Sequence, residues 1–278
     1  MIRAGVGVST ATEGRAAGEE AAAAALAGLE RVDAALLLAG PGYGETLPAL
    51  LDAAVSVLGT EAVVGATAHG VLAAGQEHQG SPAVALLALA GLETHPFLIA
   101  DPGGDEAAAC DEIAAQIGGP GRAEDLVVLL PDPRTFSPQR LLPALGEALG
   151  PAQVVGAGAA DPVSGTPRQW CGRALDSGGI AGIVLRGAEP PRIGVTQACR
   201  PVTGLLTVTR ARGHWVLELD GRPALDVYRE AARGPLAEDL RRAAAFVLVA
   251  LPVEEGAEGL EPGSYRVRHL VGFESEAT

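Results

Sequence analysis

One segment of this chain occurs twice, and the distance between the copies limits the folds available to it. Residues 63–70, Val-Val-Gly-Ala-Thr-Ala-His-Gly, return 91 positions later as residues 154–161, Val-Val-Gly-Ala-Gly-Ala-Ala-Asp. The same offset superposes Leu50-Leu51 on Leu141-Leu142 without a gap. A single repeat of this length is too long for a solenoid unit, so it predicts one domain built from two duplicated halves.

Each half has the pattern strand, helix, strand, helix, strand, strand. The expected strands are short apolar runs, and the expected helices carry leucine or alanine at helical spacing. This alternation predicts an α/β domain with a mixed sheet over residues 1–190. The strands are expected at 2–8, 34–39, 62–66 and 83–90, then at 94–100, 126–130, 153–157 and 179–186; the helices are expected at 13–29 and 47–58, then at 105–117 and 138–149.

Residues 191–278 have a different pattern and predict a second, smaller α/β domain. Two alternating runs, 205–210 and 214–219, flank a glycine and indicate a hairpin. An acidic loop is expected at 254–263, and a last strand follows near the end of the sequence, so this domain is expected to be partial. Helices are expected at 224–232 and 236–244, and strands at 246–251 and 265–273.

The charge of the chain excludes some classes of partner. The formal net charge is −14, without a run of basic residues, so nucleic acid and anionic membranes would be repelled. No apolar run approaches the roughly 20 residues that span a bilayer, and the first residues lack a signal-peptide pattern. Three widely spaced cysteines fit a reducing compartment and indicate neither a disulfide framework nor a zinc site. We therefore expect a cytoplasmic protein.

The sequence contains incomplete motifs for nucleotide binding and for catalysis. The run Gly5-Val6-Gly7-Val8-Ser9-Thr10 resembles a dinucleotide fingerprint, but Thr10 replaces the third glycine, which argues against a nucleotide. An enzyme would use Cys171 or Asp161, although no nucleophile has an evident base beside it. Cys171 is also explained as a small buried apolar residue. We expect a non-catalytic protein and keep the enzyme as an alternative.

Polar residues directly after the expected strands are the candidates for a binding site, because crevices form at the carboxyl ends of strands in open α/β sheets. Arg134 and Asp161 would together recognise a zwitterion, the guanidinium holding the carboxylate. The alternatives are a surface charge for Arg134 and a loop cap for Asp161. The full set of candidate ligand-binding residues is Tyr43, Thr67, His69, Arg134, Asp161, Arg168, Gln169 and Arg173.

Several of these segments resemble the FIST family (F-box and intracellular signal transduction proteins). The matching pieces include Val6-Gly7-Val8-Ser9-Thr10, Val64 to Gly70, Gly156 to Asp161, Gln197 to Val202, and Glu218 to Leu225. The resemblance covers the N-terminal domain of the family and the start of its C-terminal domain. Family members commonly have Cys and Glu near the positions of Ala66 and His69, where this chain departs from the pattern.

The resemblance implies a cytoplasmic sensory domain for a small molecule, of amino-acid type, coupled to a signalling protein partner. We expect the site where the two glycine loops face each other, with no cofactor or metal. Some FIST-like proteins bind haem as nitric oxide sensors, so a haem-based gas sensor stays open as an alternative. One histidine would suffice for haem, and His69 lies in the expected ligand loop.

Overall fold

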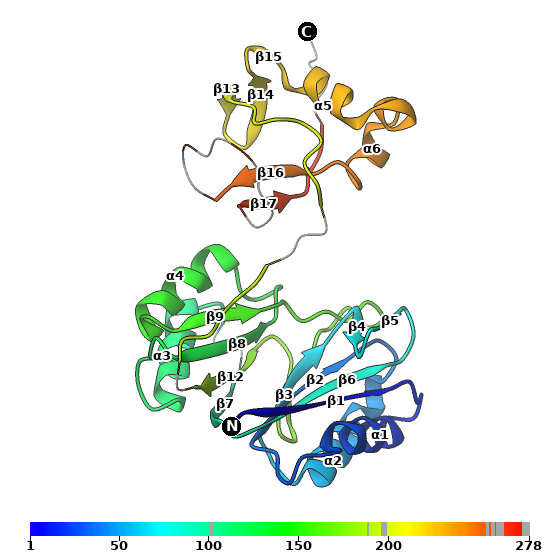
Figure 1. Ribbon diagram of the computed structural model, residues 1–278, viewed down its shortest axis with the longest axis vertical. Helices are drawn as coiled ribbons and strands as arrows, with labels where there is room; N and C mark the ends of the chain where they lie inside the picture. Colours follow the sequence, from blue (N-terminus) through cyan, green and yellow to red (C-terminus); the bar gives the residue numbers. More distant parts are fainter. Residues whose placement is uncertain are drawn as a thin grey trace. The chain divides into compact units, whose positions relative to one another are not determined.

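The computed structural model contains two compact units, Met1–Pro191 and Arg192–Thr278 (Figure 1). The α/β class predicted from the sequence is confirmed. The structure describes residues 1–100, 103–187, 189–195, 199–253, 256, 259 and 264–273. Gln197 and Ala198 of the family motif, most of the expected loop 254–263, and residues 274–278 lie outside the described residues.

The first unit contains a six-stranded sheet with the order β1-β6-β2-β3-β10-β11. β2 and β3 are parallel, and the other neighbours are antiparallel. The strands are β1 (Arg3–Ser9), β2 (Ala34–Ala39), β3 (Val63–Thr67), β6 (Val84–Ala90), β10 (Gln169–Cys171) and β11 (Ala174–Asp176); the helices on this sheet are α1 (Gly14–Leu26) and α2 (Leu47–Leu58), the latter preceded by the 3-10 turn η1 (Gly44–Thr46).

The second sheet has the order β7-β12-β8-β9. Its strands are β7 (Glu93–Ile99), β8 (Asp125–Pro131), β9 (Gln153–Gly156) and β12 (Ile180–Arg186), and its helices are α3 (Glu106–Gln116) and α4 (Pro138–Leu149). Only β8 and β9 are parallel. The order β7-β12-β8-β9 repeats the order β1-β6-β2-β3 of the first half, with the same directions. The common origin of the halves remains a prediction from the sequence.

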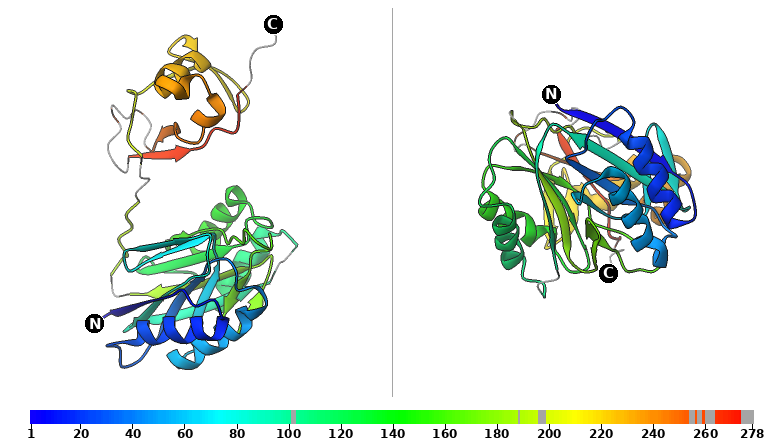
Figure 2. Two further views of the ribbon diagram at one scale, coloured as in Figure 1. Left: turned by 90° about the vertical axis from the view of Figure 1, so that its right-hand side faces the viewer. Right: turned by 90° about the horizontal axis from the view of Figure 1, so that it is seen from below.

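The first unit has four layers, with the two sheets face to face and the helices outside (Figure 2, right). One apolar core lies between α1, α2 and the first sheet, and includes Leu37, Leu50 and Trp170. A second joins the sheets through Val64, Ala66 and Ile183, among others. A third lies between the second sheet and the helices α3 and α4. The continuous apolar strands predicted from the sequence are therefore strands covered on both faces.

The glycines of β1 allow α1 to lie close to the sheet. A Cβ atom added at Gly5 would lie 1.9 Å from the carbonyl oxygen of Ala25, and one at Gly7 would lie 1.9 Å from that of Ala21. The alanine face of α1 is buried on this surface. The Gly-x-Gly pattern that resembles a dinucleotide fingerprint thus serves helix packing.

Two hairpins were not expected from the sequence. β4 (Gly70–Ala73) pairs with β5 (Gln76–Gln79), and β10 pairs with β11. β5 lies in a polar stretch, β4 is only four residues long, and β10 and β11 are only three residues each. β10 also pairs with β3, so the insertion in the second half completes the sheet of the first half. A strand whose partners lie a hundred residues away leaves little local signal.

The second unit combines small sheets with short helices. The expected helix 236–244 is divided into the 3-10 turn η2 (Gly234–Ala237) and α6 (Leu240–Ala243), because the Asp239 carboxylate accepts a hydrogen bond from the Arg242 amide and starts a new turn. No helix within the described ranges is both long and apolar enough to span a membrane. The remaining elements are β13 (Val208–Arg212), β14 (Trp215–Leu219), β15 (Arg222–Pro223), α5 (Ala224–Ala232), β16 (Val249–Pro252) and β17 (Tyr265–Arg268).

Candidate functional site

The loops that follow β3 and β9 meet at the carboxyl ends of the parallel strands. The Ala160 amide donates to the Thr67 carbonyl at 2.9 Å, which joins the two glycine loops directly. The Thr67 amide donates to the Arg168 carbonyl at 2.9 Å, and the Arg168 amide donates to Thr67 Oγ1 at 3.0 Å. Thr67 therefore holds both ends of the segment 160–168.

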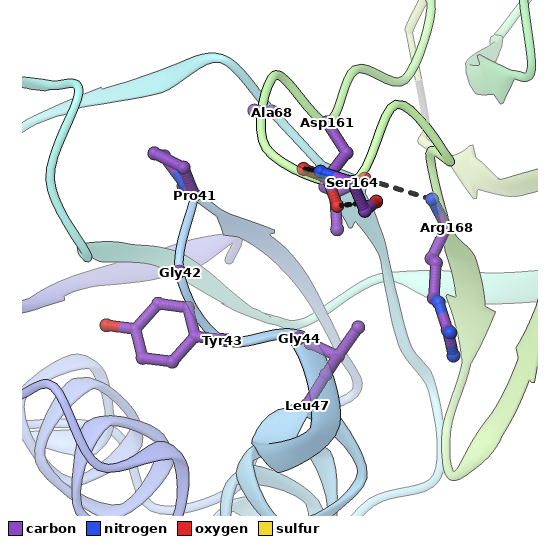
Figure 3. Close-up of a pocket in the computed structure, with 11 residues that line it drawn as sticks. Pro41, Gly42, Tyr43, Gly44, Leu47, Ala68, Asp161, Ser164 and Arg168 are labelled. Carbon is purple, nitrogen blue, oxygen red and sulfur yellow. Dashed lines mark hydrogen bonds between the residues drawn. The ribbon is translucent and has the colours of Figure 1, made fainter.

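A small cavity lies beside this junction (Figure 3). Its volume is about 60 Å³, and its walls come from the loop after β2, the end of β3 and the segment that follows β9. Four of the eight candidate residues line it: Tyr43, Thr67, Asp161 and Arg168. The other lining residues are Gly40, Pro41, Gly42, Gly44, Leu47, Ala68 and Ser164.

Tyr43 contributes its ring to this wall, and its hydroxyl faces away. The hydroxyl donates to the Ala11 carbonyl at 2.8 Å, and Figure 3 shows it turned away from Asp161 and Ser164. Burial and, second, the charge of Glu20 raise the pKa of Tyr43 to about 12. The preceding Gly42 has φ +102°, a conformation that favours glycine and lets the loop bend at this wall.

Asp161 organises the turn that it begins. Its Oδ1 accepts from the amides of Val163 and Ser164 at 2.9 and 3.0 Å, and its Oδ2 accepts from Ser164 Oγ at 2.6 Å. Burial raises the pKa of the Asp161 carboxyl, but these hydrogen bonds outweigh burial, and the net pKa is lowered. Asp161 is thus a carboxylate at neutral pH. Ser164 was missed in the sequence, although an Asp and a Ser three positions apart are a capping signal.

Arg168 supplies the positive charge of the cavity. Its side chain is exposed, and Figure 3 shows it extending away from Asp161. Within the described part of the chain, its guanidinium makes no hydrogen bond or ion pair. A ligand that reaches this wall therefore meets a cation whose donors are available.

Arg134 does not line the cavity, because its guanidinium is paired with Asp132. The Nε and Nη2 atoms donate to the two carboxylate oxygens of Asp132 at 3.1 and 2.7 Å, and Asp132 is fully buried. Nη1 donates to the Gly165 carbonyl at 3.1 Å. The sequence predicted that Arg134 and Asp161 recognise a ligand together; in the structure Arg134 is paired with Asp132 instead, and its Nη1 holds Gly165, next to the lining residue Ser164.

The remaining candidates lie elsewhere. His69 is exposed and is not among the residues that line the cavity. Arg173 is paired with Asp52 and Glu61 beside α2. Gln169 is fully buried, and its amide atoms have no hydrogen-bond partner among the described residues.

The thiol named as an alternative catalytic group is neutral at physiological pH. Cys171 is half-buried, and burial, followed by the charge of Glu61, raises its pKa. A protonated thiol is a weak nucleophile. No group of three or more His, Cys, Asp or Glu side chains among the described residues is arranged to hold a metal ion.

Comparisons with known proteins agree with the resemblance seen in the sequence. Residues 33–222 match the model of the FIST N domain. The chain is 30% identical over 281 residues to Rv0628c, an uncharacterized protein of Mycobacterium tuberculosis, with 98% of this chain and 70% of the relative covered. It is 29% identical over 282 residues to Mb0898c, an uncharacterized protein of Mycobacterium bovis, with the same shares covered.

Among solved structures, a cyanuric acid hydrolase from A. caulinodans is similar with a TM-score of 0.32 and 12% identity, over 67% of this chain and 72% of that one. At this similarity nothing about the hydrolase's reaction carries over. The family model, in contrast, covers more than half of the sequence. The suspected family is therefore confirmed, and the chain belongs to the FIST family.

Proposed function

We propose that this chain is a cytoplasmic sensory protein that binds a small zwitterion, of amino-acid type, and reports its presence to a signalling partner. The observation that carries the proposal is that Asp161 and Arg168, residues of opposite charge, both line one cavity together with glycine loops from the first half. A zwitterion has the two charges that would complement this pair.

Arg168 is the residue that would bind the ligand's carboxylate. A guanidinium recognises a carboxylate through two parallel hydrogen bonds, and the donors of Arg168 are not engaged by any described residue. Asp161 Oδ2 accepts one hydrogen bond, from Ser164 Oγ, and retains a lone pair for an ammonium group. Arg168 therefore takes the role that the sequence had suggested for Arg134.

The cavity limits the size of what it can enclose. Drug-sized ligands occupy pockets of roughly 300 Å³ or more, whereas this cavity measures about 60 Å³. That space accommodates a few water molecules or the charged groups of one small molecule. A ligand with a long side chain would leave that side chain outside the cavity.

Ligand binding could be sensed because the walls of the cavity come from both halves of the first unit. The loop 40–44 belongs to the first half, and the segment 161–168 belongs to the insertion in the second half. A ligand that contacts both favours the conformation in which the two are held together, and it shifts the population toward that state. A partner that distinguishes the two states would then read the signal.

Thermal shift with a panel of free amino acids and related zwitterions tests this function. A ligand at a hundred times its dissociation constant stabilises the protein by about 2.7 kcal/mol, which raises the melting temperature measurably. Arg168→Gln should abolish the shift and leave the apo melting temperature nearly unchanged. Arg122→Gln is the matched control, because Arg122 is also exposed and its side chain makes no hydrogen bond within the described residues. A panel without a single hit, or a shift that survives Arg168→Gln, would overturn the proposal.

A further inference from the structure

The side chain of Gln169 is a buried polar group without a partner. It is 0% exposed, and neither Oε1 nor Nε2 has a hydrogen-bond partner in the described part of the chain. Native proteins satisfy almost all buried polar atoms, with protein groups, water or a ligand. A side-chain amide has one acceptor atom and two N–H donors, so both Oε1 and Nε2 of Gln169 can bind a partner.

The strand register shows where this amide points. Gln169 pairs with Ala66 of β3 and with Asp176 of β11. Ala66 and Cys171 belong to the apolar layer between the two sheets, whereas Trp170 faces the core under α1 and α2. Because alternate residues of a strand share a face, Gln169 points into the layer between the sheets. Arg168, one position earlier, is directed to the opposite face.

Asp176 adds a third unpaired atom at the same place. It lies directly across from Gln169 in the hairpin, and its Oδ2 is buried without a hydrogen-bond partner among the described residues. This oxygen lies near the backbone of Gly179, where an added Cβ would approach it to 2.5 Å. No described cationic side chain forms an ion pair with Asp176. Two acceptors and one amino group thus converge at one end of an apolar layer.

We propose that Gln169 and Asp176 form a second binding site, between the two sheets, for a small molecule that carries a primary carboxamide or ureido group. One N–H of such a group donates to Gln169 Oε1, and its carbonyl accepts from Gln169 Nε2, as in an amide dimer. Its second N–H donates to Asp176 Oδ2. All three unpaired atoms are then satisfied by one neutral group, and the apolar remainder of the molecule lies against the layer that contains Ala66 and Ala181.

Neutral amide recognition fits the surroundings better than an ammonium ion. An ammonium group has donors only, so it would leave the amino group of Gln169 without an acceptor. A buried water, which has two donors and two acceptors, is the competing occupant, and the titration below distinguishes it from an amide. The site is independent of the zwitterion proposed for the cavity, since it lies on the other face of β10.

Titration of ¹⁵N-labelled protein with acetamide tests the site. The probe offers the carboxamide alone, and N,N-dimethylacetamide is the matched control because it has no N–H. We expect a saturable shift of the Gln169 side-chain NH₂ signal with acetamide and none with the control. That signal is identified by its loss in Gln169→Leu. No saturable shift, or equal shifts with both probes, would show that the atoms are satisfied by water only and would overturn the proposal.

Variants separate binding from folding. Gln169→Leu keeps the volume and removes the unpaired atoms, so it should fold, and the dissociation constant for acetamide measured by calorimetry should rise at least about tenfold. Asp176→Asn should weaken binding by a smaller factor. Arg168→Gln should bind acetamide as the wild type does, so failure of the zwitterion proposal and failure of this one are distinguishable. Unchanged acetamide affinity in Gln169→Leu would refute the assignment.

Discussion

Thr67 and Arg168 lie 101 positions apart in the chain and are joined by two hydrogen bonds. The Thr67 amide donates to the Arg168 carbonyl at 2.9 Å, and Thr67 Oγ1 accepts from the Arg168 amide at 3.0 Å. The Thr67 carbonyl also accepts from the Ala160 amide at 2.9 Å. A single residue of the first half thus fixes the segment that carries Asp161, and the geometry of the cavity depends on it.

Replacing the Thr67 hydroxyl should therefore weaken this junction. We expect Thr67→Val to lower the free energy of unfolding by about 1 kcal/mol, because the Arg168 amide loses its acceptor. Thr67→Ser retains the oxygen and should lose less. Urea denaturation of the three proteins measures both values. A Ser variant as unstable as the Val variant would mean that the methyl group, not the hydroxyl, stabilises the junction.

Tyr43→Phe tests whether Tyr43 contributes only its ring to the cavity wall or also contacts the ligand through its hydroxyl. The hydroxyl donates to the Ala11 carbonyl and faces away from the charged residues. The variant should lose about 1 kcal/mol of stability, and the ligand-induced thermal shift should be retained. Melting curves with and without ligand measure both quantities. A lost ligand response at unchanged stability would show that the hydroxyl contacts the ligand after all.

Arg134→Gln should destabilise the chain more than a surface substitution does. Asp132 is fully buried, and the side chain of Arg134 is 47% exposed, so we expect a loss of about 2 kcal/mol, between the values for exposed and buried pairs. Asp132→Asn combined with Arg134→Gln should cost less than the sum of the single changes, because no uncompensated carboxylate remains. Hydrogen exchange in segment 161–168 should be faster in the single and in the double variant, because the Gly165 carbonyl no longer accepts a hydrogen bond from Arg134 Nη1. If the losses of unfolding free energy were additive and the hydrogen exchange of segment 161–168 did not change, Arg134 would not stabilise this segment through its pair with Asp132.

Asp125 gives the fold a defined acid sensitivity. Burial alone would raise the pKa of this carboxyl, but hydrogen bonds from the Arg186 side chain and the Arg122 amide outweigh it, and the pKa is lowered. A carboxyl whose pKa is lower in the folded state stabilises the protein fully above its unfolded pKa of about 3.9. The contribution is lost as the pH falls through the folded value. The difference in unfolding free energy between wild type and Asp125→Asn should therefore be constant near neutral pH and shrink below about pH 4. A constant difference throughout would contradict the assignment.

The sequence predicted the elements whose signals are local. The apolar run Ala34–Ala39 is β2 in full, and the leucine spacing of Leu47–Leu58 is α2. β10 could not be predicted, because its partner β3 lies far away in the chain and its three residues carry no alternation. The position of Arg134 was missed for a similar reason. Asp132 lies two positions from Arg134, but the sequence does not show that this carboxylate is buried and paired with the guanidinium.

Replacing two glycines by alanine should change the free energy of unfolding in opposite directions. A Cβ at Gly7 would lie 1.9 Å from the Ala21 carbonyl oxygen, and relief requires the whole of α1 to move. We expect Gly7→Ala to cost about 1–3 kcal/mol, as overpacking of a core does. Gly146 lies inside α4, and apart from its chain neighbours and the nearby helix backbone no described atom lies within 4 Å of an added Cβ, so Gly146→Ala should stabilise the fold by about 0.5–1 kcal/mol. Chemical denaturation of the two variants checks the pair. If Gly7→Ala were neutral, the close contact between β1 and α1 would not be what selects glycine there.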